Sequence, residues 1–110
     1  MKKILVICSA GISGMILAKK LNTFFKNLNK EVKVDFTVGE IFINSNGNDF
    51  YDMYILSPQI KYLYGSIEKL INCKDKIIKI SSDDYSIDDL KITKITNLVM
   101  NKFKKEGLNG

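Results

Sequence analysis

The chain has 110 residues, 45% hydrophobic and 26% charged, so it can form one globular domain with a modest core and leaves no room for a second. It contains no histidine, and all 17 basic residues are lysine, which excludes a histidine general base, a histidine zinc ligand and an arginine phosphate clamp. The net charge of +5 favours acidic partners, although lysines spread along a whole chain more often form a solvated surface.

The N-terminus, MKKILVIC, begins like a signal peptide, but its apolar run stops at Cys8 and a glycine-rich turn follows. No stretch approaches the roughly 18 apolar residues that span a bilayer. We therefore expect a cytoplasmic protein without direct membrane insertion, in which Cys8 and Cys73 are reduced thiols.

A strand and a helix are predicted at the start of the chain. The continuous apolar run Ile4–Cys8 is typical of a strand covered on both faces of a parallel sheet. After a turn, helical spacing begins at Ser13, which is expected to be the N-cap. The apolar face of this helix is predicted to consist of Met15, Leu17, Leu21, Phe24, Phe25 and Leu28.

The middle of the chain predicts two more strands and another helix. Val32–Val38 alternates apolar and polar residues, as a half-exposed edge strand does. Gly39–Asp49 holds a short apolar piece followed by a turn-rich stretch, and Tyr51–Leu56 reads as the third strand. Pro58 suits the first turn of a helix. Apolar residues then recur at helical spacing, namely Ile60, Leu63, Tyr64, Ile67, Leu70 and Ile71.

The last elements predicted are a fourth strand, Lys76–Ile80, and a final helix from about Ser86 to Lys105. The residues expected to face inward from this helix are Ile87, Leu90, Ile95, Leu98, Val99 and Phe103. This order of elements implies an α/β fold, with a four-stranded parallel sheet flanked by helices in three layers. Right-handed crossovers make strand order 2-1-3-4 the natural closure, as in flavodoxin-like proteins and low-molecular-weight phosphatases, with residues 1–110 as a single domain.

The segment that carries chemistry joins the first strand to the first helix: Cys8, Ser9, Ala10, Gly11, Ile12, Ser13, Gly14 and Met15. Backbone N–H groups near a helix N-terminus favour a bound anion, and the glycines allow its close approach. A cysteine at the mouth of such a site is expected to be partly ionised to the thiolate. A thiolate beside a phosphate cradle indicates a phosphocysteine, whereas Cys73 is interpreted as a small hydrophobic residue.

Other anion-binding loops differ from this one in their residues. Low-molecular-weight tyrosine phosphatases need an arginine six residues after the cysteine, where this chain has Gly14. A Walker loop would need Gly-Lys-Ser/Thr, and the glycines do not follow the dinucleotide pattern, although Asp35 near the end of the second strand is a faint echo of it. No metal site and no cofactor are predicted. Without a C-x-x-C pair, a thiol-redox role has little support. Nucleic-acid binding would rest on the net charge alone.

Two motifs resemble a known family. Cys-Ser-Ala-Gly-Ile-Ser after the first strand and Leu-Ser-Pro-Gln-Ile after the third are similar to the lactose/cellobiose (chitobiose) type enzyme IIB family of the sugar phosphotransferase system. A Tyr85-Ser86…Asp89 segment resembles the family's Tyr-Gly…Asp-Gly, so the likeness covers nearly the whole chain. Here Gly14 and Met15 replace loop hydroxyl residues, Ser57 stands where glycine is usual, and Leu90 follows Asp89.

The resemblance implies a phosphotransferase without a cofactor. Cys8 would take a phosphoryl group from a histidine of the IIA component and pass it to a sugar bound by the membrane IIC component. The backbone of Ser9–Met15 would cradle the phosphate, and contacts with this loop or with a partner are expected from Ser57, Pro58, Gln59 and Tyr85. The alternative is a non-catalytic regulatory or binding module of the same fold, which the loss of loop hydroxyls favours. Nothing demands more than a monomer, and the sugar is not encoded in this chain.

Overall fold

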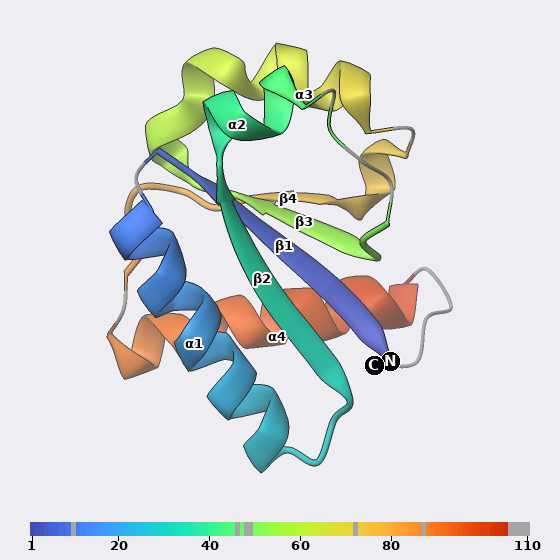
Figure 1. The fold of residues 1–110 in the computed structure, drawn as a ribbon. Coiled ribbons are helices and arrows are strands. Elements are labelled where there is room, and N and C mark those ends of the chain that lie inside the picture. Colours follow the sequence, from blue (N-terminus) through green and yellow to red (C-terminus); the bar gives the residue numbers. More distant parts are fainter. Residues whose placement is uncertain (10, 46, 48–49, 72, 87, 106–110) are drawn as a thin grey trace.

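The computed structural model describes residues 1–9, 11–45, 47, 50–71, 73–86 and 88–105. It confirms the predicted architecture, with one parallel sheet in the order β2-β1-β3-β4 (Figure 1). The strands are β1 (Lys2–Cys8), β2 (Val32–Val38), β3 (Met53–Leu56) and β4 (Ile77–Lys79). The predicted order 2-1-3-4 is therefore correct, and the flavodoxin-like fold places β1 at the centre of the sheet and β2 at its edge.

Helices cover both faces of the sheet (Figure 1). One face carries α1 (Gly11–Asn27) and α4 (Asp89–Lys105), and the other carries α2 (Gly39–Asn44) and α3 (Tyr64–Leu70). Two short 3-10 helices complete the described elements, η1 (Pro58–Leu63) just before α3 and η2 (Lys74–Lys76) just before β4. The helix predicted from Pro58 is thus a 3-10 helix that continues as α3, and Tyr62 within it is 70% exposed.

Alternation along β1 divides the core into two clusters. Ile4 and Val6 point toward α1 and α4, where they pack with Leu17, Phe25 and Ile95 among others. Leu5 and Ile7 point the other way, into a cluster that includes Phe42, Tyr54, Leu56, Ile60 and Ile67. Because both faces of β1 are buried, its run of apolar residues is continuous, as the sequence predicted.

The first helix begins earlier than predicted. It starts at Gly11, so Ser13 is its third residue and the prediction that Ser13 is the N-cap is wrong. Met15 and Leu28 are 43% and 51% exposed, and their predicted place in the core is also wrong. Leu17, Leu21 and Phe25 recur every four residues and set the buried face, from which Met15 is turned away.

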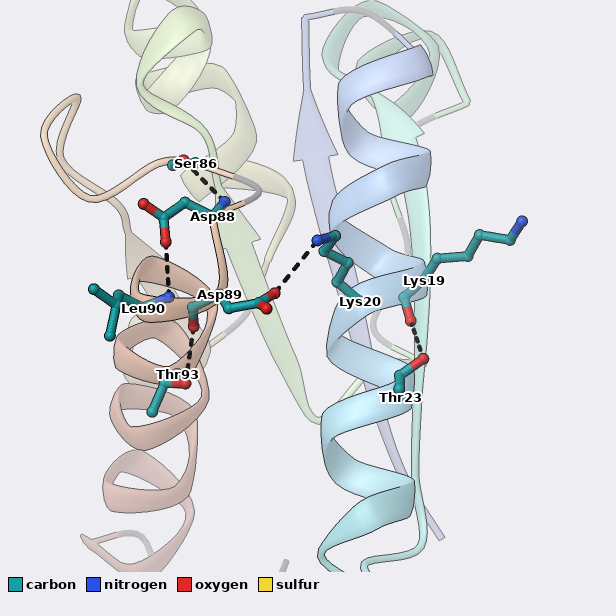
Figure 2. A network of polar contacts seen from close by, with 8 residues as sticks. All are labelled: Lys19, Lys20, Thr23, Ser86, Asp88, Asp89, Leu90 and Thr93. Atoms are coloured by element: carbon teal, nitrogen blue, oxygen red, sulfur yellow. Dashed lines mark hydrogen bonds and ion pairs between the residues drawn. The ribbon is translucent and has the colours of Figure 1, made fainter.

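The last helix begins later than predicted, at Asp89 and not at Ser86. The Asp88 carboxylate accepts a hydrogen bond from Leu90 N at 2.8 Å, so Asp88 acts as the N-cap (Figure 2). In the same view, Lys20 of α1 reaches across to Asp89, at 3.4 Å. Leu90 and Leu98 are 80% and 40% exposed, so their predicted inward placement is wrong; Ile87 lies outside the described residues.

The free edge of β2 is shielded from within the chain. The side chain of Asn22 on α1 accepts a hydrogen bond from Val34 N at 2.8 Å and donates one to Val34 O at 2.9 Å. An edge strand presents unpaired backbone groups that invite pairing with another chain. Asn22 therefore occupies one N–H and one C=O of this edge as a neighbouring strand would.

Candidate functional site

Cys8 is the last residue of β1, at the carboxyl edge of the sheet, where flavodoxin-like folds bind ligands. Its side chain points to the same face as Val6, toward α1, and the residue is fully buried. The Sγ atom lies 3.4 Å from the carbonyl oxygen of Thr37 on β2, to which the thiol can donate. Thr37 was not singled out from the sequence, because its contact depends on the register that places Cys8 opposite Val38.

Gly14 of α1 lies directly over the sulphur of Cys8. A Cβ atom built on Gly14 would be 2.3 Å from Cys8 Sγ and 3.5 Å from the Cβ of Phe36. Carbon and sulphur atoms in contact stay well over 3 Å apart. The missing side chain of Gly14 therefore creates the space that the thiol occupies.

The segment predicted as a phosphate-binding loop is mostly helix. Gly11–Met15 forms the start of α1, so only Ser9 and Ala10 join it to β1; Ser9 is exposed and Ala10 is outside the described residues. The N–H groups of a helix's first turn have no partner within the helix and carry the positive end of its dipole. An anion at this end of α1 would meet backbone donors there, while the Met15 side chain lies in a separate groove beside Phe36 and Asn22.

Ser57 follows β3 directly and lies beside the end of β1. Ser57 N donates to Ile7 O at 3.0 Å, which continues the β1–β3 ladder by one residue. The residue is fully buried, and its carbonyl accepts a hydrogen bond from the Tyr64 hydroxyl at 2.9 Å. Ser57 holds the N-cap position of η1 but makes no capping bond with its side chain; Pro58 and the exposed Gln59 follow as the first residues of η1.

Tyr85 is brought over the same end of the sheet by a turn. Tyr85 N donates to Ser81 O at 3.0 Å, and the neighbouring Asp84 is paired with Lys94 of α4 at 2.9 Å. The phenol ring packs against the cluster beneath α1 and α4. Burial raises the pKa of the Tyr85 hydroxyl, the Ser13 side chain lowers it, and negative charge on Cys8 raises it further. The hydroxyl thus lies near both residues and stays protonated at neutral pH.

Part of the predicted site borders an open groove of about 510 Å³ between α1, η1 and the turn before α4. Its lining residues are Ile12, Ser13, Ile16, Leu17, Gln59, Tyr85 and Ser86. The groove therefore brings together Ile12, Ser13, Gln59 and Tyr85 from the predicted site, whereas Met15 lines a separate groove. No three Cys, Asp or Glu side chains gather into a metal-binding cluster within the described ranges. In that same part of the chain, no helix has the length and apolar character that crossing a bilayer requires.

The family model described as "PTS system, Lactose/Cellobiose specific IIB subunit" matches residues 3–103. The chain belongs to this family. Membership supports a role in phosphoryl transfer and implies IIA and IIC components as partners.

Among solved structures that match, the lactose-specific IIB component domain of the phosphoenolpyruvate:carbohydrate phosphotransferase system from Streptococcus pneumoniae shares the fold of this IIB chain. The TM-score is 0.68 and the identity 19%, over 93% of this chain and 97% of the other. A search of curated proteins found no match.

Proposed function

We propose that Cys8 carries a phosphoryl group in a cytoplasmic sugar phosphotransferase system. The observation that carries this proposal is the position of Cys8 at the end of the central strand, immediately before the N-terminus of α1. That position offers a sulphur nucleophile and backbone N–H donors to the same phosphate. The Cys-Ser-Ala-Gly-Ile-Ser motif and family membership support the same residue.

The reaction consists of two transfers. The Cys8 thiolate attacks the phosphorus of a phosphohistidine on the IIA component, so that an S–P bond forms, the N–P bond breaks, and its electron pair returns to the histidine nitrogen. A hydroxyl of the sugar held by the IIC component then attacks the same phosphorus. An O–P bond forms, the S–P bond breaks to restore the thiolate, and the hydroxyl proton leaves to solvent or to a base. Since these 110 residues contain no histidine, the donor histidine lies outside them.

Intact-protein mass spectrometry tests the proposal directly. The chain is incubated with phosphoenolpyruvate, enzyme I, the histidine carrier and a IIA component of the lactose/cellobiose type. We expect one phosphate adduct on the native chain and on Cys73→Ser, and none on Cys8→Ser. If the IIA component is charged but the native chain acquires no adduct, the proposal fails.

A second candidate function has one observation in its favour. The Cys8 side chain is fully buried and turned toward Thr37 O, as expected for a thiol that takes no part in chemistry. On this reading the chain is a regulatory or binding module that keeps the IIB fold. It would bind a IIA component without accepting phosphate, which the same experiment detects when it is combined with a binding measurement.

A further inference from the structure

Two hydroxyl groups at the candidate site are buried without a hydrogen bond of ordinary geometry to the described residues. They are Ser57 Oγ and Tyr85 Oη, and the Tyr85 hydroxyl lies beside the Ser13 side chain, which lowers its pKa. Nearly all buried polar atoms in proteins are paired, and an unpaired hydroxyl lowers stability. Both of these hydroxyls lie at the carboxyl end of the sheet, around Cys8.

Ser57 is placed on the same face as Cys8. Its backbone is extended, with φ −73° and ψ 154°, so the alternation of β3 continues through it. Ile55 packs beneath α1 and α4 and Leu56 on the opposite face, so the Ser57 side chain points toward α1, as Cys8 does. Neighbouring strands lie about 4.8 Å apart, which puts the Ser57 hydroxyl and the Cys8 sulphur within reach of one phosphoryl group.

The free hydroxyl of Ser57 is unusual for its position. A serine at the N-cap of a helix ordinarily accepts a hydrogen bond from the first turn. Ser57 stands at the N-cap of η1, before Pro58, and makes no such bond. Its hydroxyl is therefore not used for local structure.

Tyr85 reaches the same carboxyl end of the sheet from the turn before α4. Its ring lines the groove with Ser13 and Gln59, and the ionic state of Cys8 affects its hydroxyl. The raised pKa keeps this hydroxyl protonated and able to donate. Because the chain has neither arginine nor histidine, donors to a phosphoryl group must be backbone N–H groups, hydroxyls, side-chain amides or lysines.

We propose that the hydroxyls of Ser57 and Tyr85 donate hydrogen bonds to the oxygens of the phosphoryl group on Cys8. Together with the backbone N–H groups in the first turn of α1, the two hydroxyls form one set of donors. Ser57 contributes from the end of β3, and Tyr85 from the turn before α4. This inference rests on the proposed function, because it assigns further contacts to the phosphate that Cys8 would carry. It assigns a hydrogen-bond acceptor to two buried hydroxyls of the site.

The test measures how far phosphate moves from a charged IIA component to the chain at equilibrium. Native protein, Ser57→Ala, Tyr85→Phe and the control Ser66→Ala, an exposed serine in α3, are mixed with the phosphorylated IIA protein at a fixed ratio. A hydrogen bond to a charged group is worth a factor of about ten to a hundred. We expect each site variant to lower the equilibrium constant for Cys8 phosphorylation by that factor, and Ser66→Ala to leave it unchanged.

Two further readouts separate this role from a structural one. The 31P NMR titration of the phosphocysteine should show a higher phosphoryl pKa in both site variants, because donors favour the dianion. Thermal unfolding of the unphosphorylated Ser57→Ala protein should occur at the same or a higher temperature, since the substitution removes an unpaired buried hydroxyl.

The experiment distinguishes failure of this inference from failure of the proposed function. If the native chain is never phosphorylated, both proposals fail together. If it is phosphorylated, and both site variants reach the native extent with the native phosphoryl pKa, the assignment of Ser57 and Tyr85 is wrong while Cys8 remains the carrier. A marked loss of thermal stability in Ser57→Ala would also overturn it, by showing that the hydroxyl supports the fold.

Discussion

Replacing Gly14 with alanine should move the Cys8 thiol without unfolding the protein. The added methyl carbon would lie 2.3 Å from Cys8 Sγ, more than 1 Å closer than an ordinary contact of about 3.5 to 4 Å. Backbone shifts rarely absorb so large an overlap. The sulphur can escape by a single rotation about χ1 to another staggered position, at the cost of its hydrogen bond to Thr37 O.

The size of the effect follows from two opposing terms. Alanine in a helix is favoured over glycine by about 1 kcal/mol, and the lost hydrogen bond costs about 0.5 to 1.5 kcal/mol. The free energy of unfolding should therefore change by no more than about 1 kcal/mol. If that hydrogen bond holds the thiol in place, its loss raises the population of the outward thiol roughly two- to twelvefold.

The assay is the rate of alkylation of Cys8 by iodoacetamide, followed by mass spectrometry in a Cys73→Ser background that removes the exposed second thiol. Gly65→Ala is the matched control, because a Cβ atom on Gly65, also in a helix, meets nothing within 4 Å. We expect faster alkylation in Gly14→Ala and an unchanged rate in Gly65→Ala. Equal rates in a folded Gly14→Ala protein, or its failure to fold, would refute the argument that the thiol rotates away.

Three further predictions concern stability. Asn22→Leu removes two hydrogen bonds to the edge of β2 and should lower the free energy of unfolding by about 1 to 3 kcal/mol in urea, with increased self-association. The Tyr51 hydroxyl donates a hydrogen bond to Asp35, and the pKa of Tyr51 is raised to about 12. The native protein should therefore have a higher free energy of unfolding than Tyr51→Phe below pH 10.0, and this difference should disappear as the pH rises toward 12. The hydrogen bond from Lys94 lowers the pKa of Asp84 below 3.8. The native protein should therefore have a higher free energy of unfolding than Asp84→Asn above that pH, and the difference should vanish as the pH falls through the lowered pKa.

Each of these predictions has an outcome that contradicts it. Native stability and native association state in Asn22→Leu would mean that the edge of β2 needs no cover. Parallel stability profiles of native protein and Tyr51→Phe up to pH 12 would mean that ionisation of Tyr51 is not linked to folding. A constant difference between native protein and Asp84→Asn below pH 3.8 would assign the effect to packing and not to charge.

The sequence was sufficient for the order of elements and the topology. Ile4–Cys8 is apolar throughout because β1 is covered on both faces, and Val32–Val38 alternates because β2 is an edge strand. Both patterns depend only on which side chains are buried, so they can be recognised without knowing the first and last residue of each strand. Helix phases were harder to predict. Ile92, Ile95 and Val99 set the buried face of α4, and Leu98 lies about 100° away from Val99 around the helix.

The candidate site was predicted only in outline. The motif located Cys8 and its neighbours, because an apolar strand followed by serine and glycine residues is a local pattern. Contacts between distant segments carry no such pattern. The place of Gly14 over the sulphur depends on how α1 packs on β1, and the alignment of Ser57 with Cys8 depends on strand register. Both required the three-dimensional structure.

The burial of Cys8 is compatible with a carrier function. Its thiol donates a hydrogen bond of 3.4 Å to Thr37 O, and releasing such a bond costs about 0.5 to 1.5 kcal/mol, or roughly a two- to twelvefold loss in availability. Enzymes accelerate reactions by at least about a millionfold, so a cost of this size would leave nearly all of the catalytic advantage intact. A thiol at rest beneath Gly14 would also be shielded from oxidants between transfers, since oxidation follows exposure. Burial of Cys8 therefore distinguishes a carrier from a regulatory module less sharply than the buried hydroxyl of Ser57 does. A module that binds no phosphate would have no reason to keep that hydroxyl without a hydrogen bond.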